Sequence, residues 1–121
     1  MENASDPKKT TNPGHSTLAI TKVTNHLGEV VPPGGTLITR QFATFSGTCP
    51  PHPKTRMLIF TRLDTPGAYE FPVVANATTW ETKANFRNPG SWEHVIKDSD
   101  FDESSPPVTY VWMDVTNPLV E

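Results

Sequence analysis

The sequence predicts an all-β fold, a mostly antiparallel β-sandwich of seven to eight short strands. Proline occurs 13 times in 121 residues, and it disfavours long helices because it lacks an amide hydrogen and clashes with the preceding turn. Short runs of β-branched and aromatic residues recur, separated by turn residues roughly every 8–12 positions. Hydrophobic residues make up 35% of the chain, which is enough for one core at this length.

The N-terminal part of the chain is expected to contribute strands at 18–23 and 36–48, with a brief extended piece at 30–31. Turn residues rich in glycine and proline separate these segments. Phe42 and Phe45 are the expected apolar anchors of the second strand. A proline-rich segment that cannot pair inside a sheet follows it.

The remaining strands are expected at 57–60, 68–75, 78–84, 92–96 and 108–115. The first of these is the most hydrophobic run and the predicted central strand, flanked by Arg56 and Arg62. Pro72 lies inside the next one, which favours an edge strand or a bulge because proline cannot donate to a ladder. An acidic loop is expected at 98–107.

Charge and hydropathy exclude several classes of protein. The net charge is −3 and the ten lysines and arginines are scattered, whereas nucleic-acid binders present a basic face. No run of 18 apolar residues exists, so a transmembrane helix is not expected. The N-terminus carries no basic region followed by an apolar run, so we expect no signal peptide.

Domain organisation follows from the change in composition near residue 17. Residues 1–16 are polar and without periodicity, and we expect a disordered arm. Residues 17–121 are expected to form one sandwich domain. Cys49 is the single cysteine, so no disulfide within the chain is predicted, although pairing between two chains stays open.

Several segments resemble bacterial Ig-like repeats, the domains found in large surface and adhesion proteins. The segment LAITKVTNHLGEVVPPGGT is similar to the beginning of such repeats, and FSGTCPPHPKTRMLIF contains a second motif of the family. NPGSWEHVIKDSD and SPPVTYVWMDV resemble the last two strands. The matching positions in the first two motifs are Ile20, Val23, Asn25, Gly28, Gly34, Gly35, Thr36, Ser46, Gly47 and Thr48.

The resemblance covers residues 18–115 and implies an Ig-like sandwich. It further implies a non-catalytic interaction module of an adhesion, secreted or surface-associated protein, placed outside the cell or on its surface. The partner is expected to be a protein or a glycan, and the oligomeric state is left open. Two alternatives remain, a carbohydrate-binding sandwich and a structural spacer, since sandwiches of this type host unrelated functions.

Aromatic residues are the candidate ligand contacts. If Val111 and Met113 point into the core, Tyr110 and Trp112 form an outward strip, and with Trp92 they would stack on sugar rings or pack against a partner. The competing interpretation places Tyr110 and Trp112 on the buried face.

Acidic residues and a cysteine are the other candidates for chemistry. Asp98, Asp100, Asp102 and Glu103 are spaced like oxygen ligands of calcium, but the pattern lacks the glycine and glutamate of an EF-hand. Calcium is therefore one interpretation and a solvated acidic loop the other; we expect no other cofactor. Cys49 and His52 supply only two of the ligands that a zinc site needs. The sequence contains no Ser/His/Asp group or phosphate-binding loop, so an enzyme is not expected.

Overall fold

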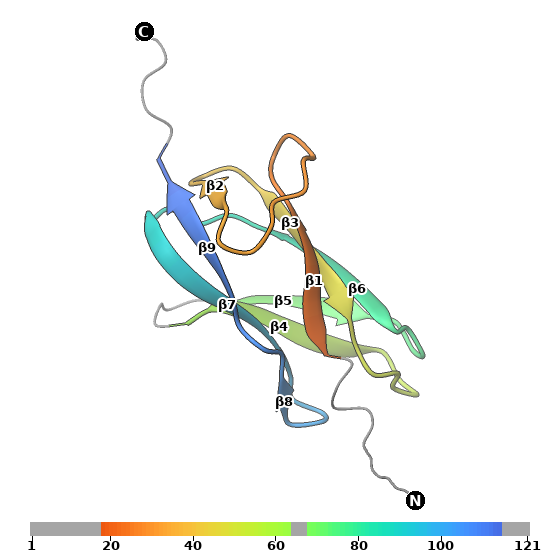
Figure 1. Cartoon of the computed structure of the whole chain (residues 1–121). Coiled ribbons are helices and arrows are strands. Elements are labelled where there is room, and N and C mark those ends of the chain that lie inside the picture. The colour runs from red at the N-terminus through yellow and green to blue at the C-terminus, as the bar shows by residue number, and fades with distance from the viewer. Residues whose placement is uncertain (1–17, 64–67, 115–121) are drawn as a thin grey trace, which may run out of the picture.

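The protein is an all-β, two-sheet structure, as the sequence predicts (Figure 1). The computed structural model describes residues 18–63 and 68–114. The arm predicted at 1–16 therefore lies outside the described residues. Within the described ranges no helix is long and apolar enough to cross a membrane.

The smaller sheet has three antiparallel strands in the order β1-β3-β6. They are β1 (Ala19–Thr24), β3 (Ala43–Thr48) and β6 (Thr79–Ala84). Ala43 pairs with Ala84 where β3 begins and β6 ends, so the residues just before β3 and just after β6 lie at the same end of the sheet.

The larger sheet has six strands and curls like half a barrel. Its main path is β2-β9-β7-β4-β5, and β8 pairs with β7. The β2–β9 pair is parallel and the other pairs are antiparallel. The strands are β2 (Thr36–Ile38), β4 (Arg56–Arg62), β5 (Tyr69–Val73), β7 (Gly90–Asp98), β8 (Glu103–Ser104) and β9 (Val108–Met113).

The described residues form nine strands, where the sequence predicts seven to eight. The segment predicted as one strand at 36–48 divides into β2 and β3, which belong to different sheets. Arg40 has a φ of 66° in the turn between them, a left-handed conformation that suits a sharp reversal. Phe42 lies in this turn and is 54% exposed, so its expected role as a core anchor was wrong. The short strand β8 lies in the segment predicted as an acidic loop.

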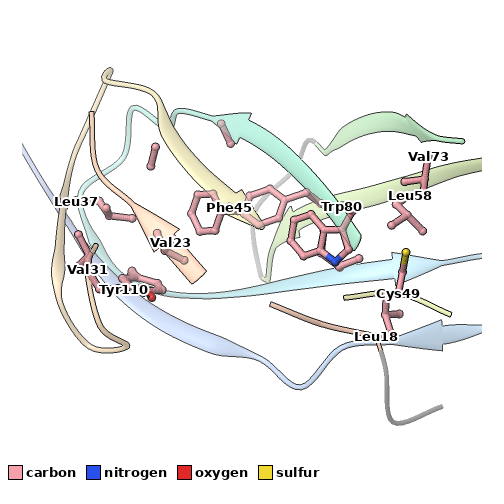
Figure 2. Close-up of a cluster of buried hydrophobic side chains, with 14 of the residues drawn as sticks. Leu18, Val23, Val31, Leu37, Phe45, Cys49, Leu58, Val73, Trp80 and Tyr110 are labelled. Carbon is pink, nitrogen blue, oxygen red and sulfur yellow. Dashed lines mark hydrogen bonds between the residues drawn. The ribbon is translucent and has the colours of Figure 1, made fainter. Parts of the chain in front are cut away.

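The core lies between the two sheets, as Figure 2 shows for side chains from both. Alternate residues of the predicted central strand, β4, are buried: Leu58 and Phe60 in the middle, with Arg56 and Arg62 at the ends. Phe45 of β3 contacts Phe60 with ring centroids 4.4 Å apart. The two arginines therefore close the core at opposite ends of one strand.

Pro72 lies in β5, the edge strand beyond β4, which confirms the edge-strand alternative. Proline is tolerated there because an edge strand has one side without ladder bonds. The two buried arginines have different partners. Arg56 Nε lies 3.0 Å from Asp98 Oδ2, whereas the Arg62 guanidinium lies 4.0 Å from the ring centroid of Phe86.

Candidate functional site

The outward aromatic strip predicted for Tyr110 and Trp112 was wrong, and the buried alternative is confirmed. The two side chains are only 2% and 1% exposed. The Tyr110 hydroxyl donates to the carbonyl oxygen of Val31 at 2.9 Å, and Trp112 Nε1 donates to His94 Nε2 at 3.0 Å. Both polar atoms are satisfied inside the protein, as burial of Tyr and Trp requires. These residues therefore build the core and offer no stacking platform.

Trp92 is half-buried and supports a loop. Its Nε1 donates to the carbonyl oxygen of Asn88 at 3.2 Å. The guanidinium carbon of Arg62 lies 4.4 Å from the centroid of the Trp92 ring system. One side of the indole is therefore occupied by a cation from its own chain, in a cation–π contact.

The acidic residues proposed as calcium ligands have separate partners. Asp98 is buried beside Arg56, and its Oδ1 accepts the amide of Asp100 at 3.1 Å. Asp100 Oδ2 lies 3.1 Å from His52 Nε2. Among the residues described, no three His, Cys, Asp or Glu side chains gather in a group that could hold a metal ion. The geometry thus gives no support to calcium at Asp98, Asp100, Asp102 and Glu103.

Cys49 and His52 do not form a reactive pair. Cys49 is buried, its Sγ lies 3.5 Å from the carbonyl oxygen of Ala77, and burial raises the pKa of the thiol. Both ring nitrogens of His52 are engaged, since Nδ1 accepts the amide of Lys54 at 3.0 Å and Nε2 contacts Asp100. A buried thiol with a raised pKa is a packing residue rather than a nucleophile.

A hollow that the sequence did not predict lies at the end of the molecule where β3 begins and β6 ends. It has a volume of about 270 Å³ and is lined by Arg40, Asn85 and Arg87. Arg40 belongs to the turn between β2 and β3, and the other two belong to the connection between β6 and β7. The Ala43–Ala84 pair brings these two connections together although they are far apart in the sequence.

The backbone around this hollow is held from several sides. The amide of Arg40 donates to the carbonyl oxygen of Phe86 at 2.9 Å. The Tyr69 hydroxyl, from β5, donates to the carbonyl oxygen of Asn85 at 2.7 Å. Arg62 Nη1 donates to the carbonyl oxygen of Asn88 at 3.2 Å. The connection 85–88 is therefore held by two strands and a turn, which fixes the backbone from which its side chains project.

The charge at the hollow is predominantly positive. Arg40 and Arg87 are exposed. Arg40 pairs with Asp114, whose Oδ1 lies 3.7 Å from Arg40 Nη1. The same oxygen, Asp114 Oδ1, accepts the Thr39 hydroxyl at 2.5 Å, so Thr39 shares this carboxylate with Arg40. Of the two arginines that line the hollow, Arg40 alone has a contact with this carboxylate among the described residues, which leaves guanidinium donors for an anionic ligand.

Sequence reasoning missed this site because no local motif marks it. Arg40 and Arg87 stand in two different connections, and each alone reads as a solvated surface charge. Arg40 is predicted inside a single strand at 36–48 and Arg87 just after the strand at 78–84, so no signal in the sequence brings the two residues together. Comparisons of the chain with protein-family models, curated proteins and solved structures give no match.

Proposed function

We propose that the chain is a non-catalytic interaction module with an Ig-like sandwich, of the surface- or adhesion-associated kind. It binds its partner through the hollow end, the end of the molecule where Arg40, Asn85 and Arg87 line the hollow. The strand order supports the Ig-like part. In that correspondence β1, β3 and β6 take the positions of strands A, B and E, and β4, β7 and β9 those of C, F and G. β5 would be the additional edge strand next to C.

The observation that carries the binding role is the held connection 85–88 with exposed polar side chains above it. Binding residues on sandwiches are commonly placed on loops that a rigid scaffold positions. Arg40, Asn85 and Arg87 meet this description, because their side chains line a hollow open to solvent. Hydrogen bonds hold the backbone at Arg40 and Asn85, and on either side of Arg87 at residues 86 and 88.

The proposal is tested by finding a ligand and locating its contacts. The full chain is screened on glycan and peptide arrays, and each ligand that binds is titrated into ¹⁵N-labelled protein. We expect saturable amide shifts concentrated at 39–41 and 85–88, with the ligand recovered chemically unchanged. Shifts centred on the opposite β7–β8 hairpin would contradict the assigned surface. No binding on either array would favour the spacer alternative.

A further inference from the structure

The donors at the hollow come in two kinds. The guanidinium groups of Arg40 and Arg87 carry full positive charges in a planar fork, which matches a carboxylate through paired hydrogen bonds. The Asn85 side chain is neutral and carries both an amide donor and a carbonyl acceptor. A ligand complementary to all three side chains has a carboxylate next to groups that both donate and accept hydrogen bonds.

Part of this hydrogen-bonding capacity is already used. The Tyr69 hydroxyl lies 3.4 Å from Asn85 Oδ1, a long contact, while its short bond goes to the backbone carbonyl of the same residue. Asp114 contacts Arg40 from 3.7 Å, beyond hydrogen-bonding distance. The Asn85 amide nitrogen and most of the guanidinium donors are therefore available to a ligand within the described part of the chain.

The size of the hollow restricts the ligand further. The hollow is open to solvent and has a volume of about 270 Å³, so it contacts a small part of a ligand and does not enclose one. It suits a single small ring better than an extended chain. Hydroxyl groups on such a ring supply the mixed donor and acceptor character that Asn85 requires.

From these three points we infer that the hollow binds one acidic sugar residue, a hexuronate, in an acidic glycan. Arg40 and Arg87 hold its carboxylate, and Asn85 takes a neighbouring hydroxyl. This inference rests on the proposed function, because it names the ligand class of the same surface. It places recognition on arginines and an asparagine, in contrast to the aromatic stacking predicted from the sequence.

The test uses glucuronate and galacturonate as probes, with glucose, acetate and sulfate as comparison ligands. Each is titrated into the full ¹⁵N-labelled chain at low ionic strength. We expect a uronate to shift the amides of 39–41 and 85–88 with saturation, and to bind at least about tenfold more tightly than glucose or acetate. Equal binding of glucose, or of acetate or sulfate, would overturn the assignment to an acidic sugar, as would the absence of uronate binding.

Variants locate the interaction. Arg87→Gln and Arg40→Gln should each weaken uronate binding at least about tenfold. Lys22→Gln, which removes an exposed cation on the small sheet, should leave it unchanged and controls for net charge. If an array ligand binds the hollow end of all three variants equally, the inference fails while the proposed function stands. If neither an array ligand nor a uronate binds the chain, both fail.

Discussion

His94 and Trp112 form a hydrogen bond inside the core, in which Trp112 Nε1 donates to His94 Nε2 at 3.0 Å. The other ring nitrogen, Nδ1, lies 3.2 Å from the carbonyl oxygen of Val108. These two contacts are satisfied together only by a neutral imidazole that carries its proton on Nδ1. A second proton, on Nε2, would face the indole N–H.

Folding stability is therefore expected to fall in mildly acidic solution. Burial lowers the pKa of His94 from 6.5 to about 4, and the charge of Arg62 contributes in the same direction. Between these pH values the unfolded chain binds a proton that the folded chain does not. The contribution of His94 to the free energy of unfolding is therefore complete above pH 6.5, and it decreases by about 3 kcal/mol as the pH approaches 4. Urea unfolding at a series of pH values measures it.

The matched variant is His94→Gln, whose amide oxygen can accept the Trp112 N–H but does not titrate. Its unfolding free energy should depend less on pH between 6.5 and 4 than that of the wild type. Carboxylates that titrate in the same range contribute equally to both proteins and cancel in the difference. Parallel pH profiles for the two proteins would contradict the role given to His94.

The buried pair Arg56–Asp98 predicts an asymmetric mutational result. Both side chains are at most 2% exposed, and the Arg56 Nη2 group also donates to the carbonyl oxygen of Pro50 at 2.7 Å. Asp98→Asn leaves a buried, uncompensated guanidinium and should lower the unfolding free energy by about 3 kcal/mol or more. Chemical denaturation measures the loss.

The double variant Arg56→Met/Asp98→Leu separates the charge from the packing. It removes both charges and keeps apolar volume, so it should recover most of the stability lost in Asp98→Asn. Some loss remains because the Asp100 amide no longer has Asp98 as its acceptor. A double variant that is less stable than Asp98→Asn would show that packing, rather than an unpaired charge, dominates this end of β4.

At the other end of β4, stability depends on the planar shape of the Arg62 guanidinium. Arg62 contacts the ring faces of Phe86 and Trp92, with its central carbon 4.0 and 4.4 Å from their centroids. Lysine keeps the charge but not the planar group that lies on both rings, so Arg62→Lys should cost about 1–2 kcal/mol. Lys97→Arg, on an exposed position of β7, is the reciprocal control and should change stability little. Equal effects of the two substitutions in urea unfolding would contradict the stacking contribution.

The sequence predicted those parts of the fold that depend on local pattern. The hydrophobic run between Arg56 and Arg62 became β4, and Pro72 marked an edge strand, because strand propensity and the missing proline N–H act locally. The buried face of β9 was not determined in this way. Both faces of β9 are apolar, one with Tyr110 and Trp112 and the other with Val111 and Met113. Which face is buried depends on hydrogen-bond partners elsewhere in the chain, His94 and Val31.

The candidate site was beyond sequence reasoning for a related reason. Arg40 and Arg87 acquire a joint role only through the register in which Ala43 pairs with Ala84. The acidic residues are the reverse case: their spacing in the sequence is typical of calcium ligands, but the structure gives Asp98 and Asp100 separate partners. Asp98 ends β7 with its side chain in the core, whereas Asp100 lies beyond the strand against His52.

Gly47 is expected to be among the least replaceable residues of the small sheet. It lies in β3, opposite Ile20, where the register with β1 shifts. A Cβ added there would overlap the carbonyl oxygen of Ala19 and lie 3.0 Å from Trp80 Cζ2. Backbone cannot yield as a flexible side chain does, so Gly47→Ala should cost about 3 kcal/mol or more.

Gly28→Ala is the matched control: Gly28 has a φ of 83° and open space around it, so only backbone strain of about 1 kcal/mol is expected. Thermal unfolding with a similar loss for both variants would contradict the close approach of β1 at Gly47.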